Sequence, residues 1–414
     1  MDNFVTSPRA RVYFGMHQEE QVAPAVVAAG GKRVLLLYGQ PHVTDPELLT
    51  LLKTSLQRQG LYCLSRGGVY RNAPLDFIHS TAMLCRSENI DFIVAIGGGS
   101  AINSAKAVAV SALQQPAEGE DPHNFDCLKW LREGQSVTAA LKLCCIITVP
   151  GSGEAISERG TVSVRNEDAT LRLYDFSAEC LMPSFVICNP ALVTSFPKHL
   201  GISCANIMVR VLERYFTNSR CVELTDRLCE GIMVTVRLML QRLRDDPDDY
   251  EARANIMWAA LLSDSQVELD REQDLALERF EHALVSLYDC SHGQAVALLT
   301  PAWMEFVLRH NPLRLAQFAH RVFNVPLDFS APQVTALRGI ECLRQLFDSL
   351  GLPRCFEDLG GSGADIPLIM QALDLKEGER IGSYVKLSRA DCEVILSIVL
   401  LQRGLAVTGP RRRS

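Results

Sequence analysis

The segment Asp91–Lys106, DFIVAIGGGSAINSAK, carries the most informative pattern in this 414-residue chain. Residues 91–96, which are apolar after Asp91, predict a strand buried on both faces, followed by three glycines, a serine and a helix with small residues on one face. Consecutive glycines let the backbone bend sharply and approach a ligand closely. The free N–H groups at the helix start and the positive end of its dipole favour an anion. The pattern therefore predicts a pyrophosphate site formed by Gly97, Gly98, Gly99 and Ser100.

The first half of the chain alternates short apolar runs with helical periodicity, which is typical of a parallel sheet covered by helices. Arg33–Tyr38 predicts a doubly buried strand, and Pro46–Gln59 predicts the helix that follows it. Other predicted strands are Leu61–Leu64, Cys144–Val149 and Phe185–Cys188, and other predicted helices are Asp76–Glu88 and Ala101–Leu113. The expected fold class is an α/β domain with a parallel sheet.

Long helical patterns replace this alternation beyond about Leu192. One buried helical stripe is predicted from Leu228, Ile232, Val236, Met239 and Leu243, which recur every three or four residues. Further helices are predicted at Tyr250–Leu262, at Pro332–Leu350 and from Ser388 onward. We expect an α/β domain over residues 1–191, an all-helical domain over residues 192–406 and a basic tail over residues 407–414.

The composition excludes several classes of function. The chain has 41 Lys and Arg against 48 Asp and Glu, a net charge of −7, which argues against nucleic acid as a partner. No apolar run approaches the ~18–20 residues that cross a bilayer, and Met1–Phe4 does not begin a signal segment. We therefore expect a cytoplasmic protein without a membrane partner. The 14 cysteines include no pair separated by two residues, so they predict reduced core thiols rather than a zinc or thioredoxin-like site.

The glycine-rich segment also resembles a known family signature. GGGSAINSAK is similar to the GGGSxxDxAK signature of the iron-containing (group III) alcohol dehydrogenases, most of all their butanol dehydrogenase and NADPH-dependent aldehyde reductase branch. Four further segments support the resemblance: Val12–Gly15, Tyr250–Trp258 (YEARANIMW), Glu281–Gly293 (EHALVSLYDCSHG) and Pro301–Met304 (PAWM). The resemblance implies a dehydroquinate synthase-like fold with a dinucleotide-binding domain and a helical metal-binding domain. It also implies hydride transfer between NAD(P)H and a small aldehyde or alcohol, and a homodimer.

The resemblance places the cofactor on a defined set of residues. A second turn of small residues follows a predicted strand, and its Thr148 and Ser152 match two threonine positions of relatives. Asn72 and Lys106 match positions that face the cofactor, whereas the acid of the signature is replaced by Asn103. After the first strand, Gly39 is followed by no acid that would hold a ribose diol, which favours NADP(H) over NAD(H). Arg172 is a candidate to assist with a phosphate, or an ordinary exposed strand cation.

The metal ligands implied by the resemblance are mostly missing. The family holds its divalent ion with an Asp and a His one helical turn apart and with two later His residues. Asn206 stands at the Asp position, Arg210 at the first His and Glu278 at the second, and only His292 is kept. A guanidinium does not deprotonate and repels a cation. We therefore expect no divalent metal at this place.

Two hypotheses for the chemistry follow from this substitution. In the first, the chain is a metal-independent NADP(H)-linked aldehyde reductase in which Arg210 stabilises the oxyanion and His282 donates the proton, with His292 as the second candidate. The metal-independent maleylacetate reductases, a distant branch, set a precedent. In the second, Arg210 pairs with Glu278, Asn206 hydrogen-bonds to the pair, and the chain is a cofactor-binding or scaffolding pseudoenzyme. A different reaction on the same cofactor is a third, lesser alternative.

Overall fold

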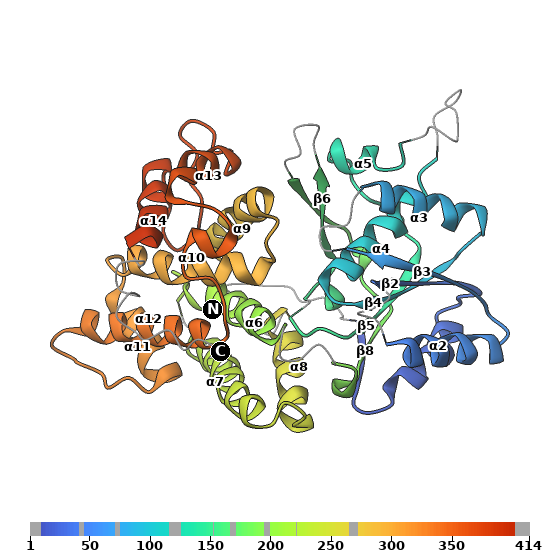
Figure 1. Ribbon diagram of the computed structural model, residues 1–414, viewed down its shortest axis with the longest axis horizontal. Helices are drawn as coiled ribbons and strands as arrows, with labels where there is room; N and C mark the ends of the chain where they lie inside the picture. Colours follow the sequence, from blue (N-terminus) through green and yellow to red (C-terminus); the bar gives the residue numbers. More distant parts are fainter. Residues whose placement is uncertain are drawn as a thin grey trace. The chain divides into compact units, whose positions relative to one another are not determined.

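The computed structural model describes residues 10–40, 45–70, 75–115, 126–151, 153–165, 171–193, 199–220, 222–264 and 272–401 (Figure 1). The described residues form two compact units. The sheet unit contains residues 10–193 and 242–264, and the helical unit contains residues 199–241 and 272–401. Residues 242–264 thus group with the sheet rather than with the helices around them in sequence. The predicted domain boundary between residues 191 and 192 stays a prediction.

The sheet unit is built on six parallel strands in the order β1-β8-β5-β4-β2-β3. These strands are β1 (Arg11–Phe14), β2 (Arg33–Gly39), β3 (Tyr62–Val69), β4 (Phe92–Gly97), β5 (Lys142–Ile147) and β8 (Phe185–Cys188). The apolar runs of β2 and β4 are buried on both faces, as parallel strands under two helical layers require. A separate antiparallel pair consists of β6 (Arg159–Arg165) and β7 (Leu171–Ser177). The predicted α/β fold class is confirmed.

Alternate residues of each central strand enter two different cores. Val34 and Leu36 of β2 pack in the core shared with α1 (Val22–Ala28) and α2 (Pro46–Arg58). Leu35 and Leu37 pack in the core shared with α3 (Leu75–Ser87) and α4 (Gly99–Ser111). In Figure 1, α2 lies on one side of the sheet and α3 and α4 lie on the other. The second core also includes side chains of α8 (Tyr250–Asp264). Shorter helices of this unit are α5 (Lys129–Arg132), η1 (Gln18–Gln21), η2 (Gly153–Ile156), η3 (Glu179–Leu181) and η4 (Pro190–Leu192).

The helical unit is organised around α10 (His292–Val307), which packs against α6 (Leu200–Tyr215), α9 (Ala276–Tyr288), α12 (Pro332–Ser349) and α14 (Arg389–Leu401). Because helices surround it, α10 is buried along most of its length. The unit also contains α7 (Glu223–Asp245), α11 (Pro312–Phe323), α13 (Ile366–Ala372), η6 (Phe356–Leu359) and η7 (Gly363–Asp365). In α7, Ile232, Val236 and Leu243 of the predicted stripe are buried, but Leu228 is 38% exposed because Cys229 takes the inward position there.

Two further predictions concern membrane association and thiols. No helix in the described ranges is both long and apolar enough to cross a membrane. Every cysteine within the described residues is free, and most of these thiols are buried, as core thiols would be.

Candidate functional site

The glycine segment forms a tight turn between β4 and α4. Gly97 has a φ angle of +147°, which only glycine adopts readily, and a Cβ atom there would lie 2.9 Å from the Cβ of Ala101. Gly98 is the N-cap of α4, so among the described residues no side chain caps this helix. The helix begins at Gly99, two residues before its predicted start, and Ser100 is exposed in its first turn. This geometry leaves the first N–H groups of α4 available to an anion.

Three of the predicted cofactor segments meet at one edge of the sheet. Gly39 ends β2, Gly97 ends β4 and Thr148 follows β5, and these three strands are neighbours with parallel direction. The N–H of Thr148 donates to the carbonyl oxygen of Gly97 at 3.1 Å, which joins the second loop to the phosphate loop. The chain reverses its direction of strand addition between β2 and β4. In open parallel sheets, ligands bind at the carboxyl ends of the strands beside such a reversal.

Lys106 of α4 is fully buried and binds the chain that follows the second loop. Its ammonium donates to the carbonyl oxygens of Glu154, Ser157 and Arg159 at 2.7, 2.6 and 2.5 Å. Burial lowers the pKa of Lys106 to about 8, although nearby Cys145 and Glu154 oppose this shift. Because an ammonium has three donors, all of them are used here. Lys106 therefore anchors α4 to the chain after the second loop, and its predicted contact with the cofactor stays a prediction.

The other predicted cofactor residues have varied surroundings. The Oδ1 of Asn103 on α4 is buried without a hydrogen-bond partner, so it could accept from a ligand. Arg172 is exposed on β7, with its guanidinium 5.2 Å from the centre of the Tyr174 ring, which suits an ordinary strand cation. Asn72 and Ser152 lie outside the described residues.

An acid that the sequence analysis did not single out lies beside the phosphate loop. A Cβ atom at Gly99 would lie 3.4 Å from Oε2 of Glu154, so this carboxylate is next to the first turn of α4. A carboxylate at a helix N-terminus is itself stabilised by the helix dipole. It would also repel a pyrophosphate at the same place, so Glu154 affects the affinity of the loop for anions.

The family metal positions converge within the helical unit. Asn206 and Arg210 lie one turn apart on α6, Glu278 lies in the first turn of α9, and His292 is the first residue of α10. The guanidinium of Arg210 forms an ion pair with Glu278, with Nη1 and Oε2 3.8 Å apart. The predicted contact between these two side chains is therefore present. Oδ1 of Asn206 and Oε2 of Glu278 are both buried without a hydrogen-bond partner. Neither of these two oxygens therefore makes the predicted hydrogen bond between Asn206 and the ion pair.

Gly293 brings α10 close to α6 at this point. A Cβ atom at Gly293 would lie 2.5 Å from the carbonyl oxygen of Ile202 and 2.7 Å from Oδ1 of Asn206. Only glycine therefore fits between the two helices without displacing them. The preceding Ser291 caps α10 through reciprocal hydrogen bonds with Gln294, which fixes the place of His292 at the helix start.

Both candidate proton donors, His282 and His292, contact one buried acid, Glu281. Oε1 of Glu281 lies 3.1 Å from Nδ1 of His292, and Oε2 lies 3.5 Å from Nε2 of His282. Burial alone would raise the pKa of Glu281, but the charge of His292 and the hydrogen bond to it outweigh burial and leave that pKa lowered. Burial would lower the pKa of His292, and Glu281 again outweighs it and leaves the pKa raised. The pair thus favours a carboxylate beside an imidazolium.

A second buried acid, Glu213, lies on α6 near the Arg210–Glu278 pair. Burial raises the pKa of Glu213 to about 7, and the charge of Arg210 only partly opposes this. Its Oε2 accepts a hydrogen bond from Gln273 at 3.1 Å. Glu213 and Glu281 were both missed by the sequence analysis. The available signal was an acid within an otherwise apolar helical face, between Leu212 and Tyr215 in one case and beside Phe280 in the other.

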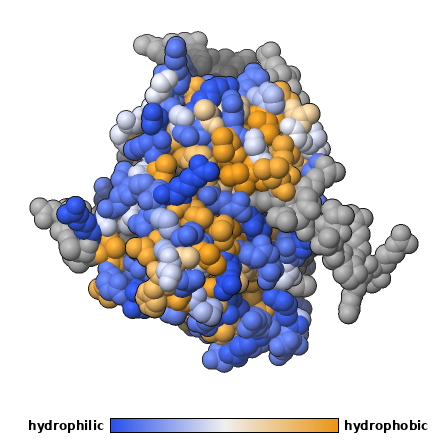
Figure 2. All heavy atoms as spheres, turned by 90° about the vertical axis from the view of Figure 1, so that its left-hand side faces the viewer, coloured by the Kyte–Doolittle hydropathy of each residue, from blue (hydrophilic) through white to orange (hydrophobic). Residues whose placement is uncertain are grey.

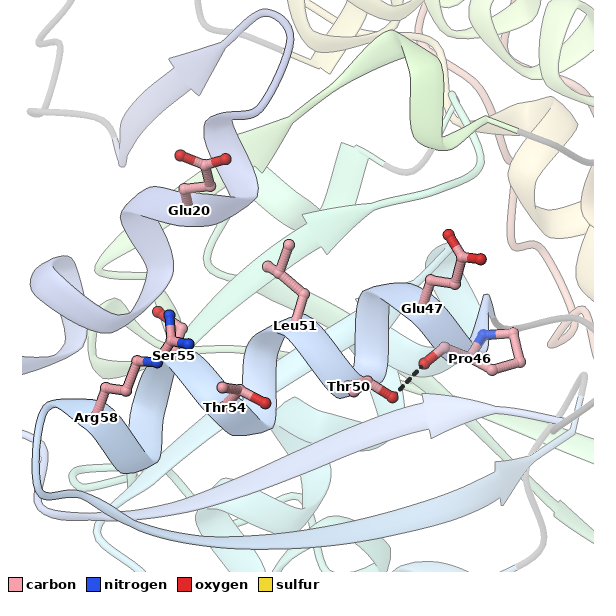
Figure 3. Close-up of a pocket in the computed structure, with 8 residues that line it drawn as sticks. All are labelled: Glu20, Pro46, Glu47, Thr50, Leu51, Thr54, Ser55 and Arg58. Atoms are coloured by element: carbon pink, nitrogen blue, oxygen red, sulfur yellow. Dashed lines mark hydrogen bonds between the residues drawn. The ribbon is translucent and has the colours of Figure 1, made fainter.

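A groove of about 770 Å³ lies elsewhere on the sheet unit, between η1 and α2 (Figure 3). Figure 3 shows Leu51 directed from α2 toward η1, and Thr50 donating to the carbonyl oxygen of Pro46 at 2.9 Å. The lining residues are Glu20, Pro46, Glu47, Thr50, Leu51, Thr54, Ser55 and Arg58. None of these is a predicted site residue, so this groove is separate from the residues to which the sequence assigns chemistry.

Comparison with known proteins matches both halves of the chain to one family. Residues 8–190 match the family model described as iron-containing alcohol dehydrogenase, and residues 202–399 match the C-terminal model of the Fe-containing alcohol dehydrogenase family. The probable NADH-dependent butanol dehydrogenase 1 of Bacillus subtilis is 29% identical over 86% of this chain and 90% of its own length. The NADPH-dependent aldehyde reductase YqhD of Escherichia coli is 26% identical over 90% of this chain and 93% of its own.

A solved structure gives the same result. The NADH-dependent butanol dehydrogenase A of Thermotoga maritima superposes with a TM-score of 0.87 at 28% identity, covering 96% of this chain and 99% of that one. The match extends over both units of the chain, so the architecture described above is that of this enzyme group.

Proposed function

The chain belongs to the iron-containing alcohol dehydrogenase family, and we propose that it is an NAD(P)H-linked oxidoreductase that interconverts a small aldehyde and its alcohol. The observation that carries this proposal is the edge of the sheet where Gly39, Gly97 and Thr148 follow neighbouring parallel strands. The uncapped start of α4 offers N–H donors to a pyrophosphate at this edge. Relatives whose names specify NADH or NADPH match nearly the whole chain.

We further propose that the reaction proceeds without a divalent metal. The residues at the family metal positions do not suit such an ion, because Arg210 is a permanent cation and is paired with Glu278. Asn206 supplies a neutral amide oxygen, and the carboxylate of Glu281 already accepts from His292. A divalent ion here would have to displace one ion pair and lie beside a guanidinium. The donor set therefore favours an internal cation over a bound one.

The residues of the helical unit can supply what a metal otherwise supplies. When bound, NAD(P)H delivers a hydride to the carbonyl carbon of the aldehyde, and the oxygen then needs charge stabilisation and a proton. Arg210 supplies a fixed positive charge for that oxygen. His282 is partly exposed and is the proposed proton donor, and His292 is the second candidate. In the reverse direction the same imidazole takes the proton from the alcohol.

The proposed cofactor is NADP(H) rather than NAD(H). Gln40 follows the end of β2, where a carboxylate would otherwise hold the ribose diol of NAD. The preference is tested by comparing kcat/KM for NADPH and for NADH with one aldehyde. A higher value for NADH would refute it.

A cofactor-binding pseudoenzyme is a second candidate, and the Arg210–Glu278 contact favours it. A guanidinium that is held by a neighbouring carboxylate is partly neutralised and is a weaker electrophile. In this case the chain would bind NAD(P)H through the sheet unit but transfer no hydride. The two candidates make opposite predictions for turnover and the same prediction for cofactor binding.

One set of measurements separates these possibilities. The purified chain is analysed for iron and zinc, titrated with NADPH by fluorescence, and assayed for NADPH oxidation with a panel of aldehydes. We expect less than stoichiometric metal, saturable NADPH binding and turnover with at least one aldehyde. Binding without turnover would support the pseudoenzyme, and a full equivalent of metal that is needed for activity would refute metal independence.

The role of Arg210 is tested by substitution. Arg210→Ala should abolish turnover and leave NADPH affinity unchanged, because the cofactor residues belong to the sheet unit. Arg227→Ala is a matched control, since Arg227 is a half-exposed arginine of the same helical unit that pairs with Glu223. Equal turnover in the Arg210 and Arg227 variants would exclude Arg210 as the electrophile.

We also propose that the chain forms a homodimer. The helical unit exposes large apolar side chains, among them Leu313 at 66% and Leu368 at 51%, and Figure 2 shows hydrophobic side chains gathered on one of its faces. Light scattering after size-exclusion chromatography would give the mass in solution. A mass near the 45.8 kDa of one chain would exclude the dimer.

A further inference from the structure

Glu281 has an unusual environment for a carboxylate. Its side chain is only 3% exposed, and its neighbours on the inner face of α9 include Leu277, Phe280 and Leu284, which are all buried. A buried ion is costly unless charged or hydrogen-bonding partners compensate it. The partners are imidazoles from two different helices, namely His282 of α9 and His292 of α10.

The two carboxylate oxygens are used separately. Oε1 approaches Nδ1 of His292 at 3.1 Å, and Oε2 approaches Nε2 of His282 at 3.5 Å. The carboxylate therefore contacts a different nitrogen in each ring. When one nitrogen of an imidazole is held by a hydrogen-bond acceptor, the acceptor fixes the tautomer and the ring orientation. In His292, whose Nδ1 is hydrogen-bonded to Glu281, this leaves Nε2 as the nitrogen that can exchange a proton.

We propose that Glu281 is a positioning residue that holds the imidazole of His292 in one orientation, with Nε2 of His292 presented for proton exchange, while its second carboxylate oxygen keeps the ring of His282 beside it. This inference rests on the proposed function, because it is the aldehyde reaction that uses the proton. It differs from a packing role for Glu281, since a packing role depends on side-chain volume and not on the two acceptor oxygens. Glu281→Gln separates the two, because glutamine keeps the volume but offers only one acceptor oxygen.

The first experiment does not depend on turnover. Imidazole 15N and 1H resonances are recorded for the wild-type chain and for Glu281→Gln, with His282→Asn and His292→Asn used to assign the two rings. We expect the wild-type His292 signal to be that of a ring protonated and hydrogen-bonded at Nδ1, and the variant to show a changed tautomer at His292 and a shifted resonance at His282. His310 and His320, which contact Asn218 and the carbonyl of Val325, are internal controls that should not change. Identical His282 and His292 signals in the two proteins would overturn the proposal.

The second experiment measures the coupling between Glu281 and the histidines. Glu281→Gln should lower kcat by about 10-fold or more, the usual loss when the partner of a functional histidine is removed, while KM for NADPH stays the same. In a His282→Asn/His292→Asn background the same change should have less than about a twofold effect, because no ring remains to be positioned. An equal loss in both backgrounds would show a structural role and overturn the proposal. If the wild-type chain turns over no aldehyde, the proposed function fails, and the resonance experiment still decides whether Glu281 positions the rings.

Discussion

Glu213 should make the stability of this chain fall as the pH rises, which is opposite to the usual effect of a paired carboxyl group. The side chain is buried on α6, and burial raises its pKa from 4.5 to about 7. In the unfolded chain the same carboxyl group ionises at its ordinary value. Between these two pKa values the folded chain holds a proton that the unfolded chain has released.

The size of the effect follows from the shift. The folded pKa of about 7 lies about 2.5 above the unfolded value of 4.5, and a pKa difference of one is worth about 1.4 kcal/mol, so the total is about 3.5 kcal/mol. Since the folded state binds more protons in this window, the free energy of unfolding decreases with rising pH. The contribution is fully present below about pH 4.5 and is lost as the pH passes 7. The ionised Glu213 then remains as a buried charge.

Glu213→Gln removes this titration and keeps an acceptor for the hydrogen bond from Gln273. We expect urea unfolding at pH 8 to show the variant more stable than the wild type by about 3 kcal/mol, and unfolding at pH 4.5 to show nearly equal stability. Glu251→Gln, which changes a carboxylate with 72% side-chain exposure, is the matched control and should show no such difference. A Glu213→Gln variant that is equally or less stable at pH 8 would refute the account of a buried, poorly compensated acid.

Three other variants test single contacts. Lys106→Met should lower the free energy of unfolding by about 2–4 kcal/mol, because three buried carbonyl oxygens lose their donor while a buried charge is removed. The same variant should bind NADPH more weakly. Denaturation measures the first effect, and fluorescence titration measures the second. Glu154→Gln should tighten NADPH binding several-fold by removing an anion beside the phosphate loop, and unchanged affinity would exclude that repulsion. Gly293→Ala should destabilise the chain by about 1–3 kcal/mol and reduce kcat, because a Cβ atom would clash with Ile202 and Asn206; a fully stable and active variant would contradict the close packing of α6 and α10.

The sheet unit could be predicted well because its signals are local. Apolar runs between helical segments identified β2, β4, β5 and β8, and the glycines identified the turn before α4. Strand β3 is longer than predicted. The prediction ended the strand early because glycines such as Gly67 and Gly68 usually indicate a loop. The reason lies across the sheet, since a Cβ atom at Gly67 would lie 2.5 Å from the Tyr38 ring. A glycine that makes room for a neighbouring strand cannot be distinguished from a loop glycine within one segment.

The site was predictable where the residue itself carries the chemistry, and not where its partners decide the role. The pairing of Arg210 with Glu278 was expected from their charges and is present at 3.8 Å. The three carbonyl oxygens that accept from Lys106 could not be predicted, because they belong to residues about 50 positions later in the chain. The one sequence signal of Glu281 is that it is an acid in an otherwise apolar helical face, and this does not identify its partner His292 on the next helix.

Charge balance supports the proposal that α6, α9 and α10 pack around the family metal positions with no need for an ion. A divalent ion would bring two positive charges to its ligands. Arg210 and His292 bring the same number, because the raised pKa of His292 favours its imidazolium form. The carboxylates of Glu278 and Glu281 balance them. Glu213 is the remaining acid, and its raised pKa means that it is neutral over much of the acidic range. Because these charges compensate one another in pairs, loss of one member leaves an uncompensated buried ion. The same compensation fits both an enzyme with an internal cation and a pseudoenzyme, so turnover, rather than stability, distinguishes them.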